Sequence, residues 1–263
     1  MEFKDKVIWV TGASSGLGEA MTKAFLAEGA KLIISSRRVE VLEELKSSLG
    51  SHNIHVLPLD LMNVDTHEEV VKQAYELYGR IDILVNNGGV SQRSTAFDTE
   101  MSALKKIMDI NFYGTVSLTK ALLPYLMEQN EAHIIVTSSV MGKFAIKTRS
   151  TYCASKHALH GWFDSLRLEM EPHNISVTLV CPGFINTNIS INAVTADGSS
   201  FNQMGENHEK AMTADQFAQK LLPQLRKGKH EIYIAGFRER GAMFMKRFAP
   251  GILYRVLKNS KVS

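Results

Sequence analysis

Short runs of β-branched and apolar residues alternate along the chain with longer segments of helical period. The apolar runs span residues 7–10, 32–34, 54–57, 83–85, 134–136, 175–180 and 232–234. They are continuous rather than alternating, which is typical of strands covered on both faces. Segments of helical period include residues 17–28, 39–49, 65–78, 100–128 and 152–171. Repeated strand and helix predict an α/β domain: a doubly wound parallel sheet of about seven strands with helices on both faces.

One stretch interrupts this rhythm. Residues 184–212 are rich in Asn, Ser, Thr and Gly and show no strong period. We interpret them as a long functional loop or lid rather than as a linker. No internal repeat indicates a second folded unit, so the sequence predicts one domain over residues 1–236 and a tail over residues 237–263.

The composition is that of an ordinary soluble protein, with 44% hydrophobic residues, 22% charged residues and a net charge of +3. This small charge gives no reason to expect nucleic-acid binding. No apolar run approaches the ~18 residues of a membrane span. The first predicted strand also begins too early to leave room for a cleaved signal peptide. A cytoplasmic location is therefore expected.

The cysteines and histidines indicate neither a disulfide framework nor a metal site. Cys153 and Cys181 are the two cysteines of the chain. They fit a reducing compartment and have no Cys-x-x-Cys spacing. His157 and His160 are three residues apart, and the sequence shows no third ligand for them. We therefore expect no bound metal.

The first predicted strand runs into a glycine-rich turn, TGASSGLG at residues 11–18, which a helix follows. Glycines permit a pyrophosphate to approach the backbone closely, and the helix N-terminus supplies free amides and partial positive charge. The turn predicts a dinucleotide site. Its expected contact residues are Gly12, Ser14, Ser15, Gly16, Leu17 and Gly18. Ordinary turn chemistry stays an alternative, because the spacing differs from Gly-x-Gly-x-x-Gly.

The end of the second predicted strand bears on the choice of nicotinamide cofactor. An acid there would bind the ribose 2′-hydroxyl and repel a 2′-phosphate. The residues are Ser35, Ser36, Arg37 and Arg38, and no carboxylate occurs until Glu40. Arg37 can face a phosphate bidentately, and Ser36 can donate to it. We predict NADP(H) over NAD(H), with solvated surface arginines as the alternative reading.

Tyr152 and Lys156 lie one helical turn apart at the head of a predicted helix. A free tyrosine has a pKa of ~10, and a nearby ammonium favours its phenolate form. Such pairs are common on helix surfaces. This pair gains weight because it follows Ser138 and Ser139, which stand at a strand end where sites form in doubly wound sheets.

These motifs resemble the classical short-chain dehydrogenase/reductase family. TGASSGLG, the run NNGG at residues 86–89, Ser139, the run YCASK at 152–156 and Pro182-Gly183 match in the family's order, over about residues 4–235. The resemblance implies a Rossmann fold. Residues 86–94 and 152–159 further resemble the branch of dehydrogenase/reductase family member 7. Gly88 stands where the family usually has alanine, which we expect to loosen the loop.

The resemblance assigns four catalytic roles. Tyr152 would protonate a carbonyl oxygen as hydride arrives, or act as the base in the reverse direction. Ser139, thirteen positions before Tyr152, would bind the same oxygen in preference to Ser138. Lys156 would bind the nicotinamide ribose and lower the tyrosine pKa, and Asn111 would hold a water in the proton relay. All four positions are filled, which argues against a degenerate relative.

The resemblance also implies further cofactor contacts. The adenine end would meet the residues Asp60, Leu61, Asn87 and Gly88, and the nicotinamide would meet Pro182, Gly183 and Thr187. Asp60 could instead cap the next helix, and Asn87 could tie two strands together. Both kinds of role can hold at once.

The sequence therefore predicts an NADP(H)-dependent oxidoreductase that interconverts a carbonyl and an alcohol. The branch resemblance implies a lipophilic substrate such as a steroid or retinoid. An NAD-dependent alcohol dehydrogenase and a cofactor-binding regulatory protein without turnover are the alternatives. The family usually forms dimers or tetramers through its long central helices, here residues 100–128 and 152–171.

The tail carries the charge of the chain. Residues 237–263 contain seven basic residues and one acid, a net charge of +6, which leaves −3 for the rest. Large apolar residues and cations alternate there around Pro250-Gly251. Such segments can lie at a membrane surface. They can equally pack over the substrate cleft or against a second subunit, and we place packing ahead of peripheral membrane contact.

Overall fold

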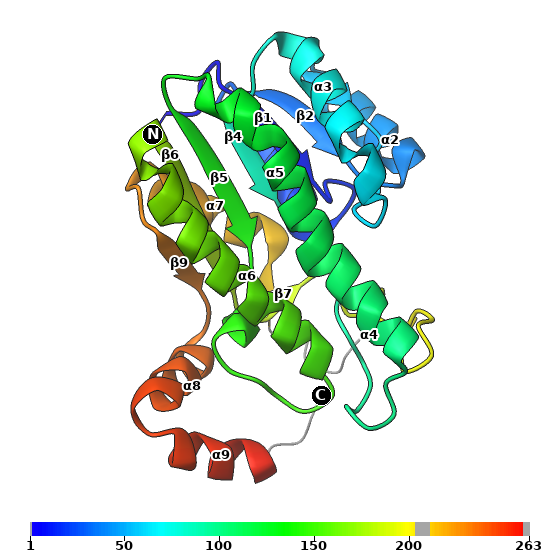
Figure 1. Ribbon diagram of the computed structural model, residues 1–263, viewed down its shortest axis with the longest axis vertical. Coiled ribbons are helices and arrows are strands. Elements are labelled where there is room, and N and C mark those ends of the chain that lie inside the picture. The colour runs from blue at the N-terminus through cyan, green and yellow to red at the C-terminus, as the bar shows by residue number, and fades with distance from the viewer. Residues whose placement is uncertain (1, 203–210, 260–263) are drawn as a thin grey trace.

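A parallel seven-stranded sheet forms the centre of the computed structural model, which describes residues 2–202 and 211–259 (Figure 1). The strand order is β3-β2-β1-β4-β5-β6-β9, with every neighbouring pair parallel. The strands are β1 (Val7–Thr11), β2 (Lys31–Ser35), β3 (Ile54–Val56), β4 (Ile83–Asn86), β5 (Ala132–Thr137), β6 (Ile175–Pro182) and β9 (Glu231–Ile234). They coincide with the seven apolar runs, so the predicted doubly wound fold is confirmed.

Helices cover both faces of the sheet. One face carries α1 (Gly16–Ala27), α2 (Val39–Leu49) and α7 (Ala214–Arg226). The other carries α3 (His67–Tyr78), α5 (Gly114–Met127) and α6 (Ser150–Met170), which stand in front of the sheet in Figure 1. Alternate residues of β1 point to opposite faces of the sheet. Ile8 and Val10 join the hydrophobic core on the face covered by α1, α2 and α7, and Val7 and Trp9 join the core on the other face. This two-sided burial explains why the strands are continuously apolar.

The helix predicted over residues 100–128 is divided by a π-helical segment. α4 (Met101–Met108) leads into the π-helix η2 (Asp109–Tyr113), and α5 follows. At the junction, α5 meets the chain after β3 very closely, because a Cβ on Gly114 would lie 2.1 Å from the carbonyl oxygen of Leu61. Such π segments occur frequently at functional sites, and this one carries Asn111.

The predicted loop of residues 184–212 has some regular structure. β7 (Ile185–Asn186) pairs in parallel with β8 (Met212–Thr213), and Val194 forms a bridge with Gln92. Residues 203–210 of this loop lie outside the described residues. Short 3-10 helices elsewhere are η1 (Val64–Thr66), η3 (Val140–Gly142) and η4 (Glu171–His173).

The tail forms two helices, α8 (Phe237–Phe248) and α9 (Pro250–Asn259), beyond the end of β9 (Figure 1). Their inner faces pack on the catalytic domain, where Ala242 and Leu253 join a buried cluster with Met141, Phe144 and Cys153. Within residues 2–202 and 211–259, none of the helices combines the length and apolar character needed to cross a bilayer.

Candidate active site

The carboxyl ends of the strands open into a cavity of about 540 Å³, a volume typical of small-molecule sites. Most of the residues predicted to bind cofactor or catalyse line it: Gly12, Ser14, Ser15, Gly16, Leu17, Ser36, Arg37, Arg38, Asp60, Leu61, Asn87, Gly88, Ser139, Tyr152, Lys156, Pro182, Gly183 and Thr187. Two predicted residues, Gly18 and Asn111, are not in its wall and lie behind it. The fold thus brings together motifs that are far apart in the sequence.

The turn between β1 and α1 is shaped for close backbone approach. Gly12 has a φ of +66°, which L side chains rarely adopt. Gly18 lies behind the turn, where a Cβ would be 2.2 Å from the carbonyl oxygen of Gly12. The first turn of α1 therefore lies directly against the end of β1. Its free amides lie at this end of the cavity, where they would stabilise an anion.

Arg38 lies across this turn. Its Nη2 donates to Ser14 Oγ and Ser15 Oγ, both at 2.9 Å, and to the carbonyl oxygen of Ser14 at 3.3 Å. Ser36 Oγ accepts from the Arg38 amide at 3.0 Å. The sequence favours Arg37 as the phosphate-binding cation. Both arginines line the cavity, but Arg38 is the one bonded to the glycine-rich turn.

Asp60 and Asn87 have the structural contacts considered as alternatives to cofactor binding. Asp60 Oδ1 accepts from the Met62 amide at 3.0 Å. Asn87 Nδ2 donates to the carbonyl oxygen of Thr11 at 3.1 Å, which ties β4 to β1. Both residues also line the cavity. Structural support and cofactor contact are therefore compatible at both positions.

Gly88 does not leave free space where the family usually has alanine. A Cβ on Gly88 would lie 2.6 Å from Cδ1 of Leu61. The leucine thus fills the room that an alanine methyl group would need. This corrects the expectation that the glycine loosens the loop.

The catalytic candidates Ser139, Tyr152 and Lys156 meet at the carboxyl end of β5. α6 places Lys156 Nζ 5.8 Å from the centroid of the Tyr152 ring. The ammonium donates to the carbonyl oxygen of Thr137 at 2.8 Å, which fixes it at the strand end. Ser139 precedes η3, and its Oγ accepts from the Met141 amide at 3.1 Å. All three side chains face one cavity.

Burial controls the proton affinities of this group. Burial raises the pKa of Tyr152 to about 12, and the hydrogen bond with Ser139 is the largest influence that lowers it. Burial lowers the pKa of Lys156 to about 8. The expected lowering of the tyrosine pKa is therefore not seen in this structure. Tyr152 is protonated at neutral pH, which is the state that a general acid requires.

Asn111 is fully buried behind these residues in the π segment. Its Oδ1 accepts from the Val90 amide at 2.8 Å, and its Nδ2 donates to the carbonyl oxygen of Val90 at 2.9 Å and to Ser155 Oγ at 3.0 Å. These bonds hold the loop after β4 against α6. The water-binding role of Asn111 stays a prediction.

Gln92 is a supporting residue to which the sequence analysis assigned no role. It is fully buried, and its Oε1 accepts from the amides of Thr151 and Tyr152 at 2.8 and 3.2 Å. Its Nε2 donates to Thr99 Oγ1 at 3.0 Å. Gln92 therefore caps the first turn of α6 and fixes the backbone of Tyr152. The partners are 59 and 60 positions apart, so local patterns cannot reveal the contact.

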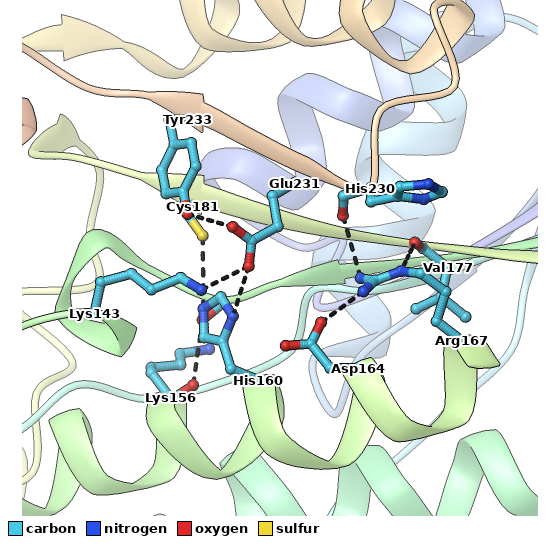
Figure 2. A network of polar contacts seen from close by, with 11 residues as sticks. Lys143, Lys156, His160, Asp164, Arg167, Val177, Cys181, His230, Glu231 and Tyr233 are labelled. Atoms are coloured by element: carbon cyan, nitrogen blue, oxygen red, sulfur yellow. Dashed lines mark hydrogen bonds and ion pairs between the residues drawn. The ribbon is translucent and has the colours of Figure 1, made fainter. Parts of the chain in front are cut away.

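A polar network beside Lys156 joins α6 to β9 (Figure 2). His160 on α6 contacts Ser138 Oγ at 3.0 Å through Nε2 and Glu231 Oε1 at 3.2 Å through Nδ1. Lys143 Nζ donates to the same Glu231 oxygen at 2.6 Å, and Tyr233 donates to the other. These partners, His160 foremost, hold the pKa of Glu231 well below its usual range. Ser138 is therefore bonded to this network, in contrast to Ser139.

The same network supplies the neighbours of His160 that the sequence did not reveal. His160, Asp164 and Glu231 each place one potential ligand atom within 4.8 Å of the others. The Lys143 ammonium already neutralises the Glu231 oxygen that faces His160. We assign this cluster to support of α6 and β9 rather than to a metal.

The remaining cavity wall comes from α4, the region around η2 and η3, the start of α6 and residues 184–200. It mixes apolar side chains and cations, among them Lys106, Ile110, Met141, Arg149, Phe184, Ile189 and Val194, with serines and asparagines such as Ser91, Asn188 and Asn192. The sequence indicates a functional loop over residues 184–212 but assigns no role to these individual side chains. They come from separate segments whose convergence depends on the complete fold.

Comparison with known sequences identifies the family. A sequence model described as short chain dehydrogenase matches residues 6–197. Dehydrogenase/reductase SDR family member 7B of Mus musculus is 40% identical over 260 residues, which cover 97% of this chain and 80% of the relative. Dehydrogenase/reductase SDR family member 7 of Homo sapiens is 39% identical over 243 residues, covering 89% and 71%.

Solved structures agree on the fold. A short chain dehydrogenase from Burkholderia cenocepacia in complex with NADP has a TM-score of 0.83 at 24% identity, covering 99% of this chain and 100% of that one. A relative from Burkholderia phymatum in complex with NAD has a TM-score of 0.81 at 21% identity, covering 100% and 98%. With the sequence matches, these findings show that the chain belongs to the short-chain dehydrogenase/reductase family of oxidoreductases, in the branch of family member 7.

Proposed function

We propose that this protein is an NADP(H)-dependent oxidoreductase that interconverts a carbonyl and an alcohol. The observation that carries the proposal is a single cavity lined by the phosphate-binding turn and by Ser139, Tyr152 and Lys156. Cofactor binding alone would not need a buried tyrosine, serine and lysine in one wall. Their presence favours turnover over a purely regulatory role.

The cavity fits a nicotinamide dinucleotide. Gly12 has a φ of +66° and lies so close to Gly88 that a Cβ would be 2.8 Å from the Gly88 Cα, so the turn is tight and its backbone borders the cavity. The amides at the start of α1 favour a pyrophosphate there. Asp60 and Asn87 would border the adenine end, and Thr187 the nicotinamide end. The bound cofactor would supply the hydride, while the protein supplies the proton and the positioning.

The arginines support the phosphorylated cofactor. Arg38 is bonded to Ser14 and Ser15, and Arg37 and Ser36 line the same part of the cavity. The end of β2 has serine where an acid would favour NAD(H). Related structures contain either NADP or NAD, so the preference rests on these side chains.

The proposed chemistry follows from the protonation state of the site. Tyr152 is protonated at neutral pH, a state that burial strengthens by raising its pKa to about 12, and it donates its phenolic proton to the carbonyl oxygen. Ser139 donates a hydrogen bond to the same oxygen and so stabilises the charge that develops there. The Lys156 ammonium lies close enough to stabilise the phenolate that results.

The test is NADPH oxidation across a panel of lipophilic ketones, including steroid and retinoid carbonyls. We expect turnover by the wild type and its loss in Tyr152→Phe, with NADPH affinity retained in both. A wild type that binds NADPH but reduces no carbonyl would support a regulatory protein. Turnover with NADH alone would support an NAD-dependent alcohol dehydrogenase.

We also propose a peripheral contact between the tail and an anionic membrane surface. The outward faces of α8 and α9 expose large apolar side chains, namely Phe237, Phe244, Phe248, Ile252, Tyr254 and Val256. Exposed cations alternate with them, namely Arg238, Arg240, Lys246, Arg247, Arg255 and Lys258. This combination matches an interfacial helix facing acidic lipid, as on a cytoplasmic leaflet.

Co-sedimentation with phosphatidylserine vesicles tests the membrane contact. Removal of the tail is unsuitable, because Ala242 and Leu253 pack beside Tyr152. The variant is Phe244→Ser/Phe248→Ser, and Phe97→Ser is the control, since Phe97 is 97% exposed elsewhere. We expect binding by the wild type and the control and weaker binding by the double variant. Equal binding by all three would remove the proposal.

The oligomeric state is a separate proposal. α5 and α6 expose Met127 and Leu168, the latter at 77%. We propose that these helices join a second copy to form a homodimer or homotetramer, which would remove both side chains from water. Sedimentation velocity with Leu168→Glu tests this: dissociation supports the contact, and an unchanged assembly or a monomeric wild type contradicts it.

A further inference from the structure

Arg149 is a buried guanidinium in the wall of the catalytic cavity. It is 5% exposed, immediately precedes α6 and lies three positions before Tyr152. Its Nη1 donates to the carbonyl oxygen of Thr148 at 3.2 Å and to Thr148 Oγ1 at 3.4 Å. Within residues 2–202 and 211–259, no carboxylate forms an ion pair with it. In the part of the chain that the structure describes, its guanidinium thus bonds to neutral oxygen atoms of one residue.

A buried cation without an anionic partner is energetically costly. Burial lowers the pKa of Arg149 to about 10, so the group still carries its charge at neutral pH. An arginine that served only to hold Thr148 would not need to face the cavity. The charge is therefore available to whatever occupies that space.

Other cations increase the positive potential around Arg149. Arg93 is close enough for its charge to lower the pKa of Arg149 further. Arg93 lies over the ring of Phe201 at 5.5 Å, and its Nε is a buried atom with no hydrogen-bond partner in the described part of the chain. Lys106 lines the same cavity and donates to the carbonyl oxygen of Gly198 at 2.8 Å. Positive charges in and beside one cavity stabilise an anion there.

The neighbouring backbone is held in an uncommon conformation. Thr148 has a φ of +60°, which is rare for a β-branched residue. Strained positions of this kind persist where the surroundings fix them, and they cluster at ligand sites. Here the strain immediately precedes Arg149 and the first turn of α6.

We propose that Arg149 binds an anionic group of the substrate, a carboxylate or a phosphate ester, placed a few atoms from the carbonyl that Tyr152 protonates. The inference rests on the proposed function, since it assumes that the reacting carbonyl lies at Tyr152. Apolar side chains such as Met141 and Ile189 line the cavity beside these polar groups. The substrate class is therefore an amphiphilic ketone or alcohol with one negatively charged group.

Matched ketones test the charge directly. The carboxylate arm compares 4-oxodecanoate with its methyl ester, and the phosphate arm compares 2-oxodecyl phosphate with 1-hydroxy-2-decanone. NADPH oxidation is measured for the wild type, Arg149→Met, Arg149→Lys and the control Lys147→Met, whose exposed side chain lies outside the cavity wall. The arm with the larger preference over its neutral partner identifies the anion.

The variants should separate charge recognition from structure. We expect Arg149→Met to lower kcat/KM for the preferred anionic ketone at least ~30-fold, as for loss of a charge-assisted hydrogen bond. For the neutral partner we expect Arg149→Met to lower kcat/KM less than ~3-fold. Arg149→Lys should restore part of the activity on the anionic ketone, and Lys147→Met should leave kcat/KM unchanged. An equal loss for anionic and neutral ketones, with NADPH affinity unchanged, would show a structural role and overturn the inference.

Binding without turnover distinguishes this inference from the proposed function. Calorimetric titration of decyl phosphate and decanoate into the protein with NADP⁺ needs no reaction. Binding by the wild type and its loss in Arg149→Met support the anion site even if no ketone is reduced. If ketones are reduced but neither anion binds and neutral ketones are preferred, the anion site is wrong and the proposed function stands.

Discussion

The two ends of the cavity are built in different ways. At the cofactor end, the turn after β1 and the start of α1 are continuous in sequence, and the end of β2 lies on the strand beside β1. At the substrate end, Arg149 and residues 184–200 come from separate segments, and the buried Gln92 fixes the backbone of Tyr152 from outside the wall. The first end rests on local turn geometry that nucleotide binding commonly uses, and the second rests on contacts between segments far apart in the sequence.

Removal of the Tyr152 hydroxyl should distinguish the two ends of the cavity most clearly, because it should affect catalysis and leave cofactor binding nearly unchanged. We expect Tyr152→Phe to lower kcat about 1,000-fold, because proton donation by a positioned side chain is lost. Its NADPH dissociation constant, measured by fluorescence titration, should stay within ~3-fold, because the phosphate turn is unchanged. Residual activity within ~10-fold of the wild type would mean that another group supplies the proton.

Gln92 tests whether the substrate end depends on long-range capping. Gln92→Leu leaves the buried amides of Thr151 and Tyr152 without their acceptor, at a cost of about 2 kcal/mol in unfolding free energy. Urea unfolding measures this loss. Gln92→Glu, which keeps an acceptor, should retain more of the stability. Equal stability of wild type and Gln92→Leu would contradict the capping role.

Arg38 tests the cofactor end. Arg38→Ala should weaken NADPH binding about 10-fold, the order expected for one charge-assisted contact to phosphate. NADH binding serves as the internal control, because it lacks the 2′-phosphate and should change little. Arg37→Ala, measured in parallel, shows how the two arginines share the contact. Unchanged NADPH affinity in both variants would contradict the predicted cofactor preference.

The smallest expected effect is a pH dependence of NADPH affinity, which arises at Lys156 between the two ends of the cavity. Burial lowers the pKa of Lys156 to about 8, so its ammonium is present below that pH and is lost above it. Affinity for NADPH should therefore fall about 5-fold between pH 7 and 9, as the charged donor to the ribose disappears. Lys156→Met should bind weakly with no such slope. A wild-type affinity that rises over this range would contradict the assignment.

The same contrast explains what could be predicted from sequence. The seven strands follow from continuous apolar runs, and the cofactor residues follow from motifs whose members are close in sequence. The π segment around Asn111 has no comparable signature, since its residues continue the helical pattern on both sides. Arg149 and Gln92 could not be assigned roles, because their environments depend on segments that only the fold brings together.

For Arg37 and Gly88, the sequence places the residue correctly in the cavity wall but does not reveal the neighbouring side chain that bears on its role. Arg37 was given the leading phosphate role, whereas the structure bonds Arg38 to the turn. The absence of a methyl group at Gly88 was read as added freedom, but Leu61 fills that space. In each case a single neighbouring side chain, invisible in the local sequence, decides the outcome.

The most direct test of the central claim is transfer of deuterium from cofactor to product. Wild type, NADPH deuterated at the transferable position of C4 and the panel of neutral and anionic ketones are incubated, and the alcohols are analysed by mass spectrometry. Hydride transfer at this site predicts one deuterium on the carbinol carbon of the product, formed about 1,000-fold more slowly by Tyr152→Phe. Tight NADPH binding without labelled alcohol from any ketone would contradict it.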